Sequence, residues 1–195
     1  MPAHNHALRR KREAGVLRLC EDEPPRFMRA DALAPADLAG AYGPFTSRRH
    51  ARERLRDLAR EHRLCLVALG LEQRAGACFA RQLRRCAGAC VGEESTHEHR
   101  MRLITALAPL AIPRWPVPGL AVIYERSEFG DRTDAHVLRD WCWLGTAHDE
   151  AELGAMLEAP PKAELDIDIV RVLISTLRRG RPMQEVPRPL SALAA

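Results

Sequence analysis

The spacing of hydrophobic residues changes along the chain, and each spacing predicts a different kind of element. Apolar side chains every three to four residues predict a helix from Ser47, a good N-terminal cap, to about Arg63. Its expected buried face consists of Ala51, Leu55, Leu58, Ala59 and His62. A second helix should follow the capping box Ser95-Thr96-His97-Glu98 and run to about Leu107, with Met101, Ile104 and Leu107 facing a core. Two more helices are expected at 149–158 and 167–179.

Shorter runs of apolar and β-branched residues predict strands. Residues 16–20 and 26–30 should be two strands joined by an acidic, proline-containing connection, with Cys20 packed in the first strand. Tyr42-Gly43-Pro44-Phe45 has the composition of a turn. Residues 120–126 and 135–144 should form an antiparallel pair around a turn at Gly130-Asp131.

The second strand of that pair carries Trp141-Cys142-Trp143, which places both tryptophans on one face and Cys142 on the other. We therefore expect an α+β fold, with short strands and a helical cysteine-rich region followed by a small antiparallel strand pair and C-terminal helices.

Composition shifts divide the chain into four segments. The first segment, residues 1–13, looks helical over residues 2–13 but lacks a good N-terminal cap. A proline-rich connector at 109–118 marks the boundary between a region at 14–108 and an α+β subdomain at 109–181. Residues 182–195, with three prolines, read as a tail. Residues 1–102 carry 20 basic and 13 acidic side chains, a net charge of +7, whereas residues 103–195 carry a net charge of −3. The basic half suits a polyanion such as nucleic acid, although a solvated charged face explains charge alone equally well.

Four of the six cysteines lie within residues 65–90: Cys65, Cys78, Cys86 and Cys90. Thiolates select zinc, copper(I) or iron–sulfur clusters, whereas disulfides are rare in a reducing cytosol. Zinc modules usually bring two close pairs of ligands, and only Cys86 and Cys90 form one, so the spacing favours an iron–sulfur cluster. Zinc and ordinary buried thiols remain the alternatives.

Side chains near the cysteines could supplement this site. His97 and His99 could bind a metal, but their predicted helix explains them as surface residues. Gly88 and Gly92 allow the backbone to turn tightly around a bulky ligand.

Arginines line the predicted helix at 47–63 and recur between the cysteines. Arg48, Arg49 and Arg52 could lie along a phosphate backbone, or they could form a solvated face balanced by nearby acids. Arg84 and Arg85 precede Cys86 and could grip a phosphate or tune a cluster. No run of apolar residues reaches the length of a membrane span, so we expect a cytoplasmic protein without a membrane partner.

Several of these motifs together resemble a known family. They are Tyr42-Gly43-Pro44-Phe45, Ser47-Arg48-Arg49 before a long helix, the four cysteines with Arg84-Arg85-Cys86-Ala87-Gly88-Ala89-Cys90, Leu69-Gly70-Leu71-Glu72, and Trp141-Cys142-Trp143-Leu144-Gly145. The combination is similar to the UvrC family of excision-repair endonucleases, and most similar to its shorter branch, Cho. The resemblance covers nearly the whole chain.

The resemblance implies a [4Fe–4S] cluster on Cys65, Cys78, Cys86 and Cys90, and incision of damaged duplex DNA marked by UvrA and UvrB. It also makes residues 1–13, with Asn5, Arg9 and Arg10, the closing stretch of a GIY-YIG nuclease domain. The nuclease residues upstream of that stretch, which hold the divalent metal, are absent from this sequence.

We therefore expect this chain to bind DNA, with Arg9 and Arg10 assisting, but not to cut it alone. The alternative is a non-catalytic subunit that docks on UvrB or on a separately encoded nuclease domain through the strands around Trp141 and Trp143.

Overall fold

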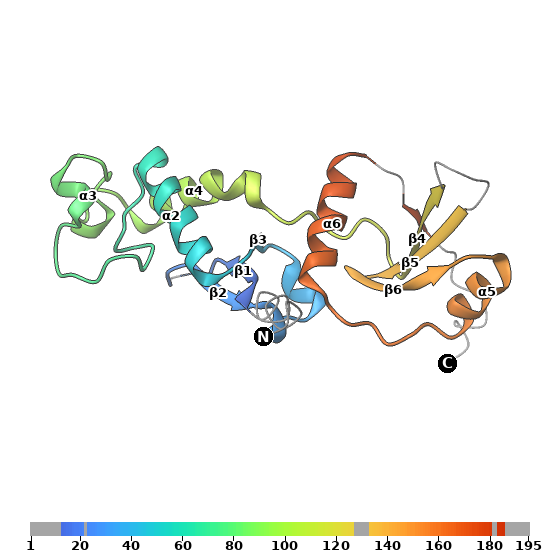
Figure 1. Cartoon of the computed structure of the whole chain (residues 1–195). Coiled ribbons are helices and arrows are strands. Elements are labelled where there is room, and N and C mark those ends of the chain that lie inside the picture. The colour runs from blue at the N-terminus through green and yellow to red at the C-terminus, as the bar shows by residue number, and fades with distance from the viewer. Residues whose placement is uncertain (1–12, 22, 127–132, 181–182, 186–195) are drawn as a thin grey trace, which may run out of the picture. The chain divides into compact units, whose positions relative to one another are not determined.

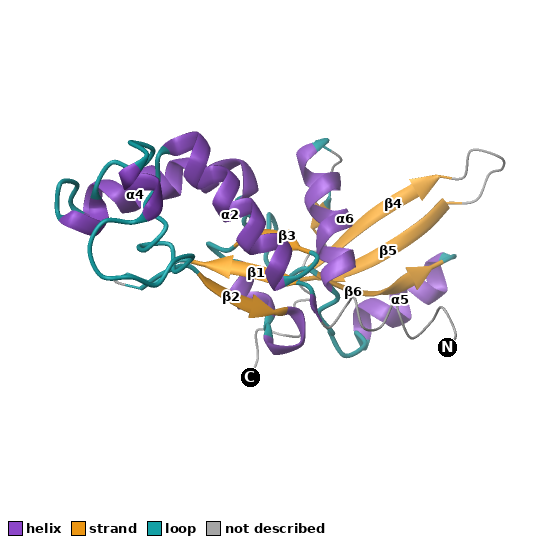
Figure 2. Cartoon of the chain, turned by 60° about the vertical axis from the view of Figure 1, so that its left-hand side comes forward, coloured by secondary structure: helices purple, strands orange, loops and turns teal. Residues whose placement is uncertain are grey.

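The computed structural model describes residues 13–21, 23–126, 133–180 and 183–185. These residues divide into two compact units, one formed by the chain up to Leu33 with Asp37–Ile112, the other by Ala34–Ala36 and the chain from Pro113 onward. Each unit combines an antiparallel sheet with helices (Figures 1 and 2), which confirms the predicted α+β class. Residues 2–12 of the expected helix and the turn at Gly130-Asp131 lie outside the described residues.

The sheet of the first unit has the order β2-β1-β3, with β1 at Gly15–Arg18, β2 at Arg26–Arg29 and β3 at Tyr42–Phe45. The first two strands confirm the prediction but are shorter. The third corrects it, because Tyr42–Phe45 is not a turn: it pairs with β1 and buries the ring of Phe45 in the core. The placement of Cys20 in a strand is also wrong, since pairing between β1 and β2 ends at Arg18 and Cys20 lies half-buried beyond it.

Helix α2 (Arg48–His62) begins where predicted, because the Ser47 hydroxyl accepts a hydrogen bond from the His50 amide at 3.1 Å. It ends at Arg63, which adopts a left-handed conformation with φ 54°. Four of the five residues expected on its buried face are buried, and His62 is half-buried.

Helix α4 (Thr96–Leu107) also starts at the predicted capping box. Its buried face corrects the prediction, because Met101 is half exposed and Ile104 only partly buried. The residues that α4 does bury are His99, Leu103, Ala106 and Leu107. The two helices pack together with β1 and β3 in one core cluster, to which α2 contributes residues along its length and α4 those of its C-terminal half.

The segment between α2 and α4 contains little regular structure. Its only helical pieces are α3 (Phe79–Gln82) and a 3₁₀ turn at Ala89–Val91. Further 3₁₀ turns occur at Ala30–Ala32, Pro35–Leu38 and Ala108–Leu110. Backbone hydrogen bonds within turns, such as those from the Leu69 amide to the Cys65 carbonyl and from the Arg85 amide to the Ala80 carbonyl, hold parts of this segment, and side-chain interactions must hold these turns together.

The sheet of the second unit has the order β6-β5-β4-β7, with β4 at Leu120–Arg126, β5 at Thr133–Arg139, β6 at Cys142–Ala147 and β7 at Gln184–Glu185. The single strand expected at 135–144 is instead a hairpin, because Asp140 and Trp141 have positive φ values of 46° and 73° and reverse the chain. Trp141 is therefore buried, with its ring 5.3 Å from that of Trp115, while Trp143 is 47% exposed. The two tryptophans do not share a face; Cys142 is buried as expected.

The C-terminal helices confirm the prediction. Helix α5 (Glu150–Glu158) begins at Asp149, whose side chain accepts from the Glu152 amide, and α6 (Ile167–Arg178) begins at Asp166. Part of the expected tail is ordered, because β7 pairs with the edge strand β4. The tail beyond residue 185 lies outside the described residues.

Candidate metal centre and basic helix

The structure brings the four clustered cysteines together. Cys65 follows the end of α2, Cys78 caps α3, Cys86 lies in the loop after α3, and Cys90 lies in the 3₁₀ turn. Their sulfur atoms all lie within 4.8 Å of one another. Three of the four are fully buried and Cys90 is half-buried. Such a group of convergent thiols can bind a metal.

The loop around Cys86 and Cys90 depends on glycine. Gly88 and Gly92 have φ values of 103° and 76°, in the left-handed region that other residues avoid. A Cβ atom on Gly88 would also lie 2.6 Å from the Cβ of Glu93. This close approach lets the chain turn between two sulfur ligands, as expected from the sequence.

Backbone amides point at the sulfurs. The Cys78 amide donates to Cys90 Sγ at 3.3 Å, the Arg81 amide to Cys78 Sγ at 3.3 Å, and the Gly88 amide to Cys86 Sγ at 3.4 Å. Amide donors stabilise negative charge on sulfur, and metal ligation requires thiolates. The loop is thus arranged to stabilise the ligand form of its cysteines.

The thiols titrate differently because their surroundings differ. Burial raises the pKa of Cys65 and raises that of Cys86 to about 12. Burial also acts to raise the pKa of Cys90, but hydrogen bonds from the Cys78 amide and the neighbouring thiols outweigh it and lower this pKa. Cys90 therefore ionises before Cys65 and Cys86, and a metal must displace the protons of those two thiols.

His99 supports the cysteine cluster from α4. It is 5% exposed, and its Nε2 accepts a hydrogen bond from the Cys65 amide at 3.0 Å. Burial lowers the pKa of His99, which keeps the ring neutral and able to accept. The prediction of a surface residue is wrong for His99 and correct for His97. His99 lies four residues before the buried Leu103, on the same face of the helix, and this spacing could have indicated that His99 is buried.

A single zinc ion and a cubane iron–sulfur cluster require different separations between the four sulfur atoms. Zinc–sulfur bonds of about 2.3 Å place the corners of a tetrahedral site about 3.8 Å apart. A cubane iron–sulfur cluster spreads its four cysteine sulfurs further, because each binds a different iron atom. Both groups match the donor set, and the separations of up to 4.8 Å lie closer to those of a single ion.

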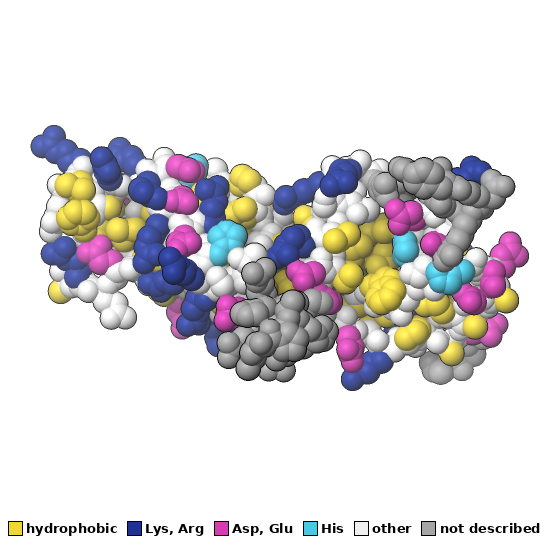
Figure 3. Space-filling view, viewed as in Figure 1, with side chains coloured by type: hydrophobic (Ala, Val, Ile, Leu, Met, Phe, Trp, Pro, Cys, Tyr) yellow, Lys and Arg dark blue, Asp and Glu magenta, His cyan; other side chains and the backbone are white. Residues whose placement is uncertain are grey.

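Ion pairs separate the arginines of α2 into two groups. Arg49 pairs with Glu53 at 2.8 Å and Arg60 pairs with Asp57, whereas Arg48 and Arg52 have no acidic partner among the described residues. Dark-blue basic side chains are prominent on the α2-containing unit in Figure 3. Arg84 and Arg85, also predicted to contact DNA, are exposed in the loop before Cys86. Arg9 and Arg10 lie outside the described residues.

Comparison with known proteins agrees with these features. Residues 16–109 match the UvrC/Cho excinuclease middle domain, and residues 120–191 match the Excinuclease Cho C-terminal domain. The chain belongs to the UvrC/Cho excinuclease family. Proteins named Excinuclease cho from Shigella flexneri, Escherichia coli (strain K12) and Salmonella typhi are each 34% identical to it over 92% of its length.

The chain spans only 60% of the length of these relatives. No solved structure matches it. Among the described residues, none of the helices has the length and apolar character needed to cross a membrane.

We predict that His99→Ala weakens metal retention, because the buried Cys65 amide loses its hydrogen-bond acceptor and the Cys65 thiolate is then held less firmly in place. Competition with a chelator should show a loss of affinity of about tenfold. His97→Ala is the matched control, since His97 is exposed on the same helix. Equal retention by the two variants would contradict a positioning role for His99.

Proposed function

We propose that this chain is a DNA-binding and metal-binding part of a UvrC/Cho-type excinuclease that acts on damaged duplex DNA in nucleotide excision repair. The observation that supports it best is the pair Arg48 and Arg52, one helical turn apart on α2, exposed and without an acidic partner among the described residues. Unneutralised guanidinium groups attract phosphates and release counterions when they bind them.

The proposed contacts are to the DNA backbone rather than to base edges. Arg48, Arg49 and Arg52 on α2 would share one phosphate strand with Arg84 and Arg85 of the cysteine-rich loop. Arg49 would contribute least, because Glu53 already balances its charge. Arg9 and Arg10 would extend the same surface. Contacts of this kind position a protein without reading sequence, as damage repair requires.

We propose a [4Fe–4S] cluster as the metal cofactor, held by Cys65, Cys78, Cys86 and Cys90. The cysteine spacing and the family support it, while the compactness of the sulfurs supports the alternative, a single zinc ion. Either group would crosslink the segment between α2 and α4 and so fix the loop that carries Arg84 and Arg85.

DNA cleavage would require a further component. We propose that the chain does not cut DNA alone and that a GIY-YIG nuclease domain supplies the divalent metal and the catalytic groups. In the cytoplasm its partners would be damaged DNA and UvrB, or the UvrB–DNA complex.

We predict that binding to duplex DNA weakens steeply with salt and that Arg48→Gln lowers the slope of log K against log salt by about one. Fluorescence anisotropy with a labelled duplex across a salt series measures it. Arg60→Gln is the control, because Arg60 is also on α2 but already paired with Asp57. Binding that does not respond to salt, or the same slope in wild type and Arg48→Gln, would argue against the assignment.

A feature of the second unit favours a second function, docking on UvrB or on a separate nuclease domain. An open groove of about 390 Å³ lies between α6 and the sheet and is lined largely by apolar side chains, among them Trp143 and Val172. Figure 3 shows a yellow apolar area on this unit. Trp143 is 47% exposed although tryptophan is usually well buried, and exposed tryptophans often anchor protein interfaces.

We predict that Trp143→Ser reduces capture of purified UvrB by the immobilised chain after nuclease treatment, by about tenfold if Trp143 is a central anchor. Tyr124→Ser is a close control, because Tyr124 is on the same sheet, is also 47% exposed and does not line the groove. Equal capture by both variants would exclude docking through this groove.

A further inference from the structure

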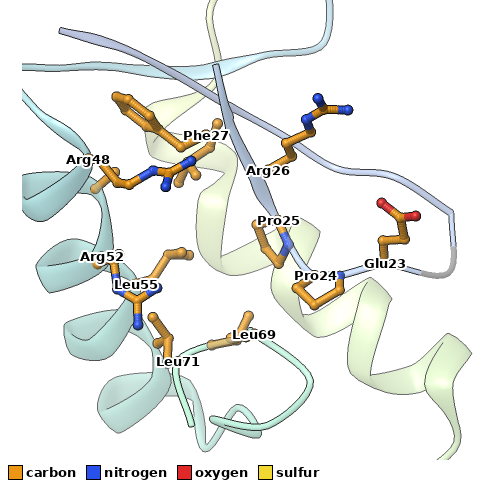
Figure 4. Close-up of a pocket in the computed structure, with 13 residues that line it drawn as sticks. Glu23, Pro24, Pro25, Arg26, Phe27, Arg48, Arg52, Leu55, Leu69 and Leu71 are labelled. Atoms are coloured by element: carbon orange, nitrogen blue, oxygen red, sulfur yellow. The ribbon is translucent and has the colours of Figure 1, made fainter. Parts of the chain in front are cut away.

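A cavity of about 300 Å³ lies beside α2 in the first unit (Figure 4). Its walls come from the first two turns of α2, the start of β2 with the connection before it, and the loop that follows Cys65. Eight of its thirteen lining residues have apolar side chains: Leu17, Pro24, Pro25, Phe27, Ala51, Leu55, Leu69 and Leu71. The cavity therefore offers a surface for an apolar or aromatic group.

Three arginines line the cavity, Arg26 at the start of β2 and Arg48 and Arg52 on α2. Arg48 extends from α2 toward β2, and Arg52 lies beside Leu55 and Leu71 (Figure 4). The acidic side chains of α2 pair with arginines other than these two. Glu23 is the single acidic residue in the lining, and neither arginine pairs with it. The site thus combines the unneutralised guanidinium groups of Arg48 and Arg52, with Arg26 also in the lining, and an apolar wall.

This combination matches the chemistry of a nucleotide. A base has flat apolar faces that pack on hydrophobic side chains, and phosphates lie on both sides of its sugar. Arg48 and Arg52 stand about 6 Å apart along the helix axis, so they can hold successive phosphates of one strand. We propose that the cavity receives one unstacked nucleotide of a DNA strand, an inference that rests on the proposed DNA binding.

A nucleotide site of this kind would affect which DNA the chain prefers. A base within an intact duplex is stacked and paired, so it reaches the cavity only at an unstacking cost. An unpaired nucleotide avoids most of that cost. The cavity would therefore favour distorted DNA, whereas phosphate contacts alone would not distinguish it from a regular duplex.

The experiment compares the affinities of the full chain for two short labelled duplexes, one fully paired and one with a single unpaired nucleotide, at one salt concentration. Wild type should bind the second about tenfold tighter. Ala51→Met fills the cavity from α2 without a change of charge and should abolish this preference while duplex affinity stays. Leu71→Glu, which places a negative charge at the half-exposed wall, should also abolish it. Arg56→Gln, on α2 outside the cavity, should weaken both complexes equally.

Thermal melting first establishes that each variant is folded, and either cavity variant is sufficient for the test. Equal affinity of wild type for the two duplexes, or a preference that persists in a folded cavity variant, overturns the nucleotide site and leaves DNA binding intact. Failure of wild type to bind either duplex overturns the proposed function and this inference with it.

Discussion

The convergence of four cysteine sulfurs is the constraint on which the first unit depends. Between the end of α2 and the start of α4 the chain has a single short α-helix and one 3₁₀ turn, so it lacks the backbone ladders that normally hold a segment in place. Three buried thiols and one half-buried thiol close this segment instead. Metal binding to such a loop is coupled to its folding, because the unfolded chain does not present the four ligands together.

The same constraint reaches the surfaces proposed to bind DNA. Leu69 and Leu71 line the cavity beside α2 and lie in the loop that leaves Cys65, whose amide is held by His99. Arg84 and Arg85 lie between the ligands Cys78 and Cys86. A change at the metal centre would therefore alter both the cavity wall and the placement of these arginines, while Arg48 and Arg52 lie at the start of α2, whose Ser47 cap does not involve the cysteine-rich loop.

Local signals in the sequence predict much of this structure. Ser47 and the box at Ser95–Glu98 mark the starts of α2 and α4 because their side chains satisfy the first free amides of a helix. The cysteine cluster was also evident, because soft ligands seldom concentrate in one segment without a metal site. The sequence could not reveal which sulfurs accept amide hydrogen bonds, because this depends on where α2, α4 and the loop meet. The pairing of Arg49 with Glu53 is local, since the two residues are four apart on α2.

Other predictions from the sequence were wrong because they depend on how the chain folds and packs. Tyr42–Phe45 has turn composition, yet pairing with β1 and burial of Phe45 make it a strand. Trp141 and Trp143 do not share a strand face because the chain reverses at Asp140 and Trp141. Turns of this kind usually contain asparagine or glycine, and neither occurs at these two positions. His99 looked like a surface residue because histidine is commonly exposed; packing against Cys65 decided otherwise.

The most direct measurement of the central claim is the metal content and absorption spectrum of the anaerobically purified chain, with thermal melting of Cys86→Ala and of Cys20→Ala as a control outside the cluster. The account predicts brown protein with about four irons per chain, which Cys86→Ala loses together with stability and Cys20→Ala keeps. Colourless protein with one zinc would replace the iron–sulfur cluster by the single ion. A metal-free wild type that melts like Cys86→Ala would contradict the claim that a metal organises this segment.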